Sequence, residues 1–351
     1  MATSASLARL GTGIAGPAKP SRTLLRLGQF LTGASSTYTI TKQLNDFVWL
    51  GSNQAGETVV IKSAPRFRIA HERDVMKKFQ SLPSFRPLLD EIVEPADPAV
   101  IVMKHLDDDL LHASNAQKLT TRELKFVSKR ILEALQALHE EGYVHTDVKI
   151  ENVLVNYAAE GSEKRFTDVQ LCDFEGTVRV DSPFCKDRHE IGTPISRSPE
   201  ATMCLQWGPP TDIWSFGNMV ISLIWGDDFS IFKPPPGTPH DSKEYILKIL
   251  EKYHIFFGPY PQSFGELCRD EGDAAVLNSV MRGVPPEKLK PFALASKREI
   301  STEDKEFILK VMKIDPRDRP TAKELLKDDW FKEVSAESES AIELISHPRL
   351  L

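Results

Sequence analysis

Three polar side chains that could carry chemistry lie close together in the stretch Tyr143–Asn152 of this 351-residue chain. Asp147 offers a carboxylate, Lys149 a cation and Asn152 an amide. The residues that follow, V-L-V-N at 153–156, predict a strand, so the three side chains lie on a loop, where rigid neighbouring elements often position catalytic groups. A base, a cation and an oxygen ligand for a metal are the groups that transfer of a phosphoryl group to a hydroxyl requires.

A second set of polar side chains follows two predicted strands. Lys62 ends the β-type run 58–61, and Glu72 lies on the helix predicted over 68–79, where it could pair with Lys62. Asp173 directly follows the apolar strand predicted over 169–172. Because magnesium prefers oxygen ligands, Asp173 and Asn152 are the expected metal ligands.

The elements that must position these side chains form a β-rich first part and a helical second part. The first part has predicted strands at 37–44, 47–50, 58–61, 88–92 and 99–103, the first three forming a meander, and the helix at 68–79. Predicted helices of the second part lie at 124–139, 211–225, 241–253, 264–284, 302–313 and 321–331, with Thr120 and Thr211 as caps of the first two. The strands at 153–155 and 169–172 flank a polar loop at 157–165.

Composition narrows the classes of function. A net charge of −6 and a pI near 5.9 give no overall attraction to nucleic acid or to an anionic membrane. No apolar run reaches the roughly 20 residues that a membrane-spanning helix needs. The 4 cysteines form no C-x-x-C pair, which favours a reducing, intracellular location in the cytoplasm or nucleus. Nothing in the sequence indicates an oligomeric state.

The N-terminal residues allow two interpretations. No acidic residue occurs before Asp46, while basic residues are scattered among Ser, Thr, Ala and Leu, as in mitochondrial transit peptides. A disordered leader with the same composition is the alternative. We therefore predict a leader or transit segment at 1–22, a folded domain at 23–333 and a polar tail at 334–351.

Several motifs in order complete the pattern. The loop reads H-x-D-x-K-x-x-N, and V-V-I-K precedes it at 59–62; D-F at 173–174, G-T-P at 192–194, S-P-E at 198–200, D-I-W-S-F-G at 212–217 and D-P-R-D-R-P at 315–320 follow. With these motifs the chain resembles the eukaryotic protein kinases over roughly 38–333. The stretch 268–296 is similar to the insert of the cyclin-dependent, MAP and SR-protein kinases, and the whole chain looks like a divergent fungal branch near that group.

The resemblance implies an α+β, bilobal protein-kinase fold, with a small β-rich N-lobe at about 38–103, a connector at 104–107 and a larger, mainly α-helical C-lobe at 108–333. It implies ATP and Mg²⁺ as cofactors, and serine or threonine hydroxyls of proteins as acceptors. The implied roles are the base for Asp147, charge neutralisation for Lys149, magnesium binding for Asn152 and Asp173, phosphate anchoring for Lys62 with Glu72, and adenine contacts for Val48, Val60, Met103, Lys104 and Leu106.

The resemblance also implies three supporting contacts. Thr193 is expected to contact Asp147 and Lys149, as in serine/threonine kinases. Asp212 is expected to brace the catalytic loop, and Arg319 to pair with Glu200. An acidic run at 107–109 would attract basic peptide substrates, or would simply be a solvated connector.

Three departures from the family pattern leave a second interpretation open. The turn at 43–48 has no glycine where a glycine-rich loop should cover the phosphates, although its backbone amides could still approach them. Glu175 stands where D-F-G has its glycine, which adds a negative charge near the nucleotide, and Thr146 stands in place of the Arg of H-R-D. A pseudokinase scaffold is therefore the alternative, whereas Lys149 and Thr193 disfavour a kinase of small molecules or lipids.

Overall fold

The computed structural model describes residues 25–332, and these residues form two compact units. The β-rich unit contains residues 25–110 and 151–177, and the helical unit contains residues 111–150 and 178–332. The predicted α+β class is confirmed, with one β-rich and one mainly helical part. The chain was expected to divide once, at 104–107; instead it passes between the units three times, and the strands after 150 belong with the β-rich unit.

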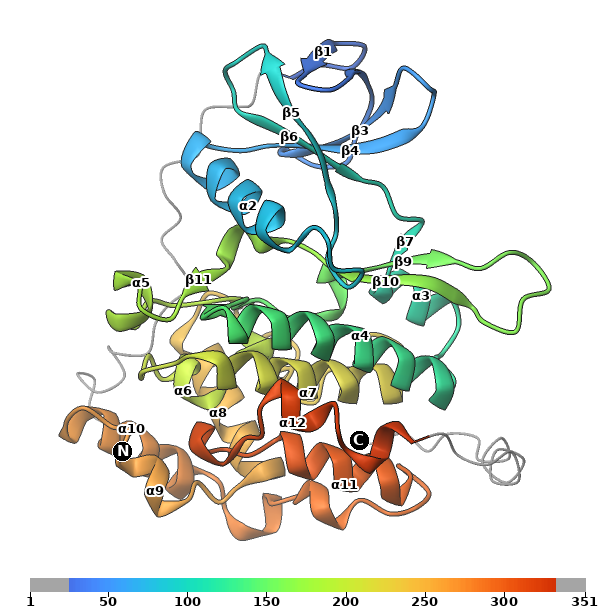
Figure 1. Cartoon of the computed structure of the whole chain (residues 1–351). Coiled ribbons are helices and arrows are strands. Elements are labelled where there is room, and N and C mark those ends of the chain that lie inside the picture. Colours follow the sequence, from blue (N-terminus) through green and yellow to red (C-terminus); the bar gives the residue numbers. More distant parts are fainter. Residues whose placement is uncertain (1–24, 333–351) are drawn as a thin grey trace. The chain divides into compact units, whose positions relative to one another are not determined.

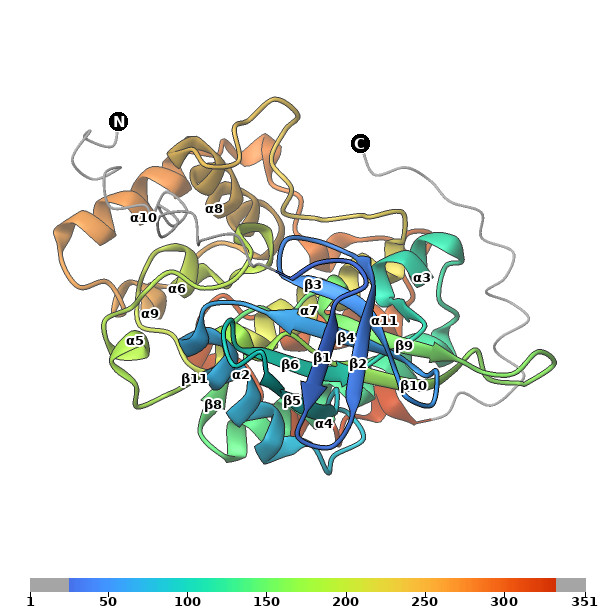
Figure 2. The same cartoon turned by 90° about the horizontal axis from the view of Figure 1, so that it is seen from above.

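The β-rich unit is built on a closed barrel in the order β1-β2-β3-β4-β6-β5 (Figure 2). Its elements are β1 (Phe30–Gly33), β2 (Thr37–Gln43), β3 (Val48–Asn53), β4 (Thr58–Ser63), α2 (Arg66–Phe79), β5 (Leu88–Glu94), β6 (Val100–Lys104), β7 (Asp108–Asp109), β9 (Val153–Tyr157) and β10 (Phe166–Leu171). Alternate residues of the strands, among them Ile40, Trp49, Ile61 and Val102, fill the barrel core. This alternation leaves the other face of each strand for contacts outside that core.

Helix α2 lies beside strands β5 and β6 of the same unit (Figure 1). Its buried face carries Ile69, Val75, Met76 and Phe79, together with the charged Glu72. A carboxylate is seldom buried without a partner, so the helix must bring Glu72 to a cation.

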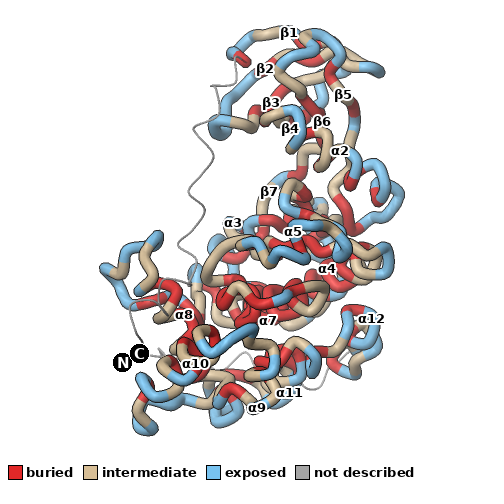
Figure 3. The backbone as a smooth tube through the Cα atoms, turned by 90° about the vertical axis from the view of Figure 1, so that its left-hand side faces the viewer, coloured by how far each residue is buried: buried red, intermediate tan, exposed pale blue. Residues whose placement is uncertain are grey.

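The helical unit surrounds α7 (Pro209–Trp225), which is buried along most of its length (Figure 3). Its other elements are α3 (Leu110–Ala116), whose first residue still belongs to the β-rich unit, α4 (Thr121–Glu140), β8 (Tyr143–Val144), β11 (Val178–Arg179), α5 (Pro183–Lys186), α6 (Pro199–Thr202), α8 (Lys243–Phe257), α9 (Gln262–Gly265), α10 (Glu271–Gly283), α11 (Thr302–Val311) and α12 (Ala322–Leu325). The ring of Trp214 on α7 stacks on Phe232 and meets Tyr253 of α8 edge-on. Because α7 is packed on most sides, the residues of its first turn, among them Asp212, are held in place.

Several predicted boundaries were wrong, each for a local reason. Helix α7 begins at Pro209 after Gly208, because proline suits the first turn, and Thr211 lies inside the helix. The helix predicted over 264–284 is two helices, because the Asp270 side chain accepts from the backbone N–H groups of Gly272 and Asp273 and starts α10 afresh. The helix predicted over 321–331 already ends at Leu325.

Four strands were not foreseen: β1, β7, and the two-residue strands β8 and β11, which pair with each other. The short strand β1 extends the predicted meander and closes the barrel between β2 and β5. Strand β7, expected to be a solvated connector, pairs with β9 through Asp108 opposite Val155 and Asp109 opposite Leu154. Strands β9 and β10 also run further than predicted, which shortens the loop between them.

The predicted leader at 1–22 and tail at 334–351 lie outside the described residues. Within residues 25–332, no helix is both long and apolar enough to cross a membrane. Thr120 caps α4 as predicted, and it does so in a capping box with Glu123.

Candidate active site

In the helical unit, Asp147 and Lys149 are held together by Thr193. The backbone N–H and the hydroxyl of Thr193 both donate to Asp147 Oδ1 at 2.9 Å. Lys149 Nζ donates to the Thr193 hydroxyl at 2.9 Å and lies 2.7 Å from Asp147 Oδ2. The predicted contacts of Thr193 are therefore confirmed, and a hydroxyl-bearing residue lies directly on the candidate base.

Asp212, at the start of α7, holds the backbone just before Asp147. Its carboxylate accepts from the backbone N–H groups of His145 and Thr146 at 2.8 and 2.9 Å, as predicted, and from His139 Nε2 at 2.9 Å. Thr146 has a φ of 74°, which is rare for a β-branched residue and costs about 1–3 kcal/mol. Asp212 offsets that strain and so fixes the direction of the next residue, Asp147.

Gly192 is the residue that lets the segment 190–193 approach this loop. Its φ is 54°, and a Cβ added there would lie 2.3 Å from the carbonyl oxygen of Thr146. Only glycine fits this position without movement of the backbone. In the motif G-T-P, the glycine is therefore required because a side chain would clash with the loop, and the threonine because it hydrogen-bonds to Asp147.

The segment between β11 and α6 is held by an apolar cluster. Val144, Cys185, Ile191, Ala201 and Trp207 pack together and are buried. The indole Nε1 of Trp207 donates to the carbonyl of His189 at 2.9 Å, which ties the segment to the loop after α6. The segment therefore has anchors that involve no phosphate group.

Replacing Ser182 with alanine is expected to leave phosphoryl transfer largely intact. Ser182 caps the short helix α5 through the N–H of Cys185, so its loss should cost about 1 kcal/mol of stability at most. Thr146 has no cation to grip a phosphate on this segment, and the apolar cluster holds it instead. Steady-state assays with a peptide acceptor test this; a loss as large as that of Asp147→Asn would contradict it.

In the β-rich unit, three carboxylates gather around one lysine. Lys62 Nζ lies 2.8 Å from Glu72 Oε2, 3.0 Å from Asp173 Oδ1 and 3.5 Å from Glu175 Oε2. The pairing of Lys62 with Glu72 was predicted, and the contact with Glu175 was not. Asp173 has a φ of 63°, a left-handed conformation that aspartate tolerates better than most residues.

These charges shift one another's pKa values. Burial lowers the pKa of Lys62, but the carboxylates of Glu72 and Asp173 outweigh it, and the pKa is raised overall. Burial also raises the pKa of Glu72, more than the nearby lysine lowers it. Lys62 therefore stays charged, and an excess of acidic groups surrounds it, which favours a further cation nearby.

The predicted adenine-contacting residues mostly share one sheet face. In the register of β3, β4 and β6, Val48 lies opposite Lys62, and Val60 opposite Met103. Because cross-strand partners and alternate residues point the same way, these side chains lie on the face opposite the barrel core. A flat apolar surface of this kind beside a lysine suits a base with phosphates attached.

Lys104 does not share the face of the other predicted adenine-contacting residues, and Leu106 lies beyond the strand that carries Met103. Lys104 lies opposite Val59, a core residue, so its side chain belongs to the other face. Its N–H donates to Pro87 and its carbonyl accepts from Arg86 Nε at 2.8 Å. Leu106 is buried, and among residues 25–332 none hydrogen-bonds to its backbone, which leaves those groups available to a ligand.

The turn between β2 and β3 satisfies most of its own amides. The N–H groups of Leu44 and Asn45 donate to the carbonyl of Val48, and that of Phe47 donates to Asn45 Oδ1. The expectation that these amides could approach phosphates is therefore wrong for three of them. The turn is a closed structure of its own and not an open cradle.

The remaining predicted ligand, Asn152, is buried in the β-rich unit, where its carbonyl accepts from the N–H of Cys172. Cys172 itself is buried, and burial raises the pKa of its thiol to about 12. This agrees with a small apolar residue and not with a reactive thiol.

Two residues of the site were missed by the sequence analysis. Arg68 could have been found from its spacing of four residues from Glu72, whereas nothing in the sequence indicates the role of Trp207.

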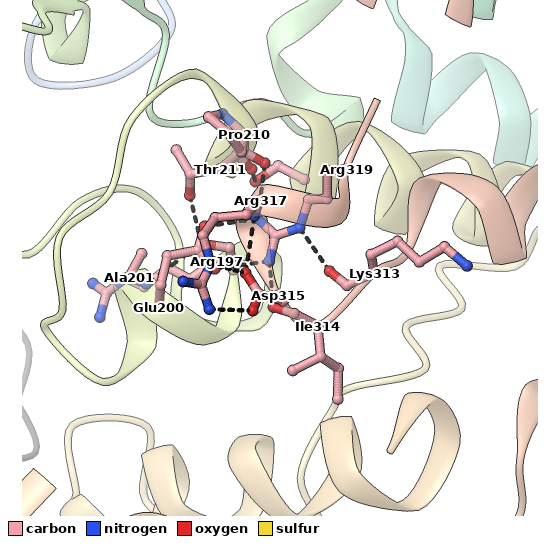
Figure 4. A network of polar contacts seen from close by, with 12 residues as sticks. Arg197, Glu200, Ala201, Pro210, Thr211, Lys313, Ile314, Asp315, Arg317 and Arg319 are labelled. Carbon is pink, nitrogen blue, oxygen red and sulfur yellow. Dashed lines mark hydrogen bonds and ion pairs between the residues drawn. The ribbon is translucent and has the colours of Figure 1, made fainter. Parts of the chain in front are cut away.

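A buried ion pair fixes the end of the segment that carries Thr193. Arg319 donates to both carboxylate oxygens of Glu200 at 2.7 and 2.8 Å, and to the carbonyls of Lys313, Ile314 and Pro210 (Figure 4). Both side chains are 0% exposed. The predicted pair is confirmed, and it joins α6, α7 and the residues after α11.

Comparison with known proteins identifies the family of the chain and its fold. Residues 54–331 match the family model described as the protein kinase domain. A probable cyclin-dependent serine/threonine-protein kinase of Dictyostelium discoideum is 27% identical over 70% of this chain and 16% of its own length. The serine/threonine-protein kinase PAK mbt of Drosophila melanogaster is 29% identical over 56% of this chain and 30% of its own length.

The chain thus spans less than a third of these curated relatives. Among solved structures, the crystal structure of the yeast RNA Pol II CTD kinase CTDK-1 complex has a chain that matches with a TM-score of 0.65 and 18% identity. The match covers 85% of this chain and 93% of that chain, and at this identity it supports the fold alone.

Proposed function

Because the chain belongs to the protein kinase family, we propose that it transfers the γ-phosphoryl group of ATP to serine or threonine hydroxyls of proteins. The observation that carries this proposal is the pair of hydrogen bonds from Thr193 to Asp147. Lys149 contacts both of these residues. A base and a cation are thereby set in one geometry before any substrate binds.

In the proposed reaction, Asp147 accepts the proton of the acceptor hydroxyl while the hydroxyl oxygen bonds to the γ-phosphorus. The bond from that phosphorus to the bridging oxygen breaks, and ADP leaves. Lys149 offsets the negative charge on the transferred group. Thr193 keeps Asp147 from turning away from the acceptor.

The β-rich unit supports binding of nucleotide and magnesium. Asp173 and Asn152 supply hard oxygen ligands, and the acidic excess around Lys62 suits a divalent cation. Bound there, Mg²⁺ would neutralise phosphate charge. Lys62, fixed by Glu72, holds phosphate oxygens, and Val48, Val60 and Met103 provide the apolar face for the base.

A pseudokinase scaffold is the second candidate, and the turn at 44–47 favours it. With three of its amides engaged, the turn offers phosphates little cover, so ATP binds more weakly than beneath a glycine-rich loop. Against the scaffold, Lys62 pairs with Glu72, and Lys149 pairs with Asp147, as the proposed phosphoryl transfer requires.

Transfer from radiolabelled ATP to a generic basic protein tests the proposal, with Asp173→Ala as the comparison. We expect incorporation by the wild type and a drop of roughly 100-fold or more in the variant, because a magnesium ligand is lost. Magnesium-dependent nucleotide binding, followed by fluorescence, should fall with it. Neither transfer nor such binding by the wild type would leave the scaffold as the function.

Further properties follow from the same proposal. Asp107–Asp109 would attract basic acceptor peptides, although Asp107 and Asp108 already accept hydrogen bonds from Tyr157. We place the protein inside the cell, in the cytoplasm or nucleus, because its four cysteines, all within the described residues, are free thiols.

A further inference from the structure

Three side chains on one face of α2 point to the segment 173–177 of the same unit. Arg68, His71 and Glu72 have the spacing i, i+3 and i+4, which puts them side by side on a helix. The first turn of the segment, Phe174–Gly176, contacts this helix closely. The face and the segment therefore meet along more than one turn of α2.

Each of the three side chains makes a specific polar contact. Arg68 Nη1 lies 3.0 Å from Glu175 Oε1. Glu72 reaches Asp173 through Lys62, at 2.8 and 3.0 Å. His71 Nε2 hydrogen-bonds with the carbonyl oxygen of Thr177. The contacts reach the beginning, the middle and the end of the segment, so they tie the helix to its whole length.

The tie through Arg68 exists only because position 175 carries a carboxylate. Among residues 25–332, Arg68 makes no other ion pair. Glu175 in turn lies between two cations, Arg68 and Lys62. The glycine that the common triplet carries here could bind neither of them, so this chain has gained a contact where the sequence pattern indicated a loss.

We infer that Arg68 and Glu175 are positioning residues, which hold α2 against the segment 173–177 so that Lys62, Glu72 and Asp173 keep their mutual contacts. The effect on phosphoryl transfer rests on the proposed function, whereas the effect on α2 itself does not. The pair also neutralises the charge of Glu175, which then does not repel phosphate.

The same geometry has one competing interpretation. Oxygen atoms of Glu72, Asp173 and Glu175 lie within 4.8 Å of one another, so Glu175 could be an additional metal ligand. A metal ligand would depend on its own carboxylate and not on Arg68. The two interpretations therefore differ in how the two residues respond to separate and joint removal.

A double-mutant cycle tests the pair with Arg68→Ala, Glu175→Ala and the combined variant. Hydrogen exchange of the α2 amides is measured without nucleotide, and kcat/KM is measured with ATP and a peptide acceptor. Each single change should speed exchange and lower kcat/KM by about threefold to fivefold, the size expected for a partly exposed ion pair. The combined variant should be no worse than either single change.

Arg66→Ala is the matched control, because Arg66 lies on the same turn and, among residues 25–332, hydrogen-bonds to the carbonyl of Ala96 and not to the segment 173–177. It should change neither readout. Additive losses in the combined variant, or unchanged exchange in both singles, would overturn the inference. A raised magnesium requirement for Glu175→Ala alone would favour the metal ligand. If the wild type transfers no phosphoryl group, the proposed function fails while the exchange measurement still tests the pair.

Discussion

Replacing Asp147 with asparagine should lower kcat for peptide phosphorylation by roughly 100- to 10,000-fold, the usual contribution of a general base. The amide cannot take the acceptor's proton. Its oxygen can still accept from the N–H and hydroxyl of Thr193, so the loop should keep its shape. Steady-state kinetics with a peptide acceptor, beside a thermal melt, separate lost chemistry from lost folding.

Asp181→Asn is a suitable control for that experiment. Asp181 lies in the same helical unit, just after β11, but it is exposed, and the ion pair that it forms within residues 25–332 is with Arg179. We expect its kcat to match that of the wild type. If Asp147→Asn kept half of the wild-type kcat, Asp147 would not be the base.

Replacing Arg319 with alanine should cost about 3–5 kcal/mol of unfolding free energy, because it leaves the carboxylate of Glu200 buried without its partner. Three backbone carbonyls lose a donor at the same time, and the guanidinium no longer packs over the ring of Trp214. Urea denaturation measured at several temperatures gives the change directly.

Lys323→Ala provides the comparison for Arg319. Lys323 also pairs with a glutamate, Glu140, at 2.9 Å, but the two side chains are 60% and 50% exposed. Exposed pairs contribute roughly 0–1 kcal/mol, so this variant should unfold almost as the wild type does. A cost below about 1 kcal/mol for Arg319→Ala would mean that Glu200 finds other partners.

Contacts between two recognised motifs could be predicted from the sequence, and contacts that involve a residue outside the motifs could not. Thr193 with Asp147, and Arg319 with Glu200, were predicted because both partners belong to recognised elements. Helix α4 was predicted because its capping box is local. Strand β1 was missed because four residues carry too little pattern, and its place depends on pairing with β5.

The charge of Glu175 shows where prediction stopped. From the sequence it was an uncompensated acid, since Arg68 lies 107 positions earlier in the chain and nothing in the pattern joins the two residues. Lys104 shows the same limit for direction: it was predicted in the connector, but it ends strand β6, where the register with Val59 turns its side chain to the other face. A shift of one residue in strand register moves a side chain to the opposite face of the sheet.

The interleaving of the two units also constrains how the chain can fold as it leaves the ribosome. Strand β7 ends at Asp109, yet its partner β9 and the neighbouring β10 lie beyond residue 152, after a long excursion into helices α3 and α4. At a synthesis rate of about 5–20 residues per second, β7 waits roughly 3–12 seconds until β10 is complete. During that interval the barrel can close on itself, while the face that carries Lys62 still lacks Asp173.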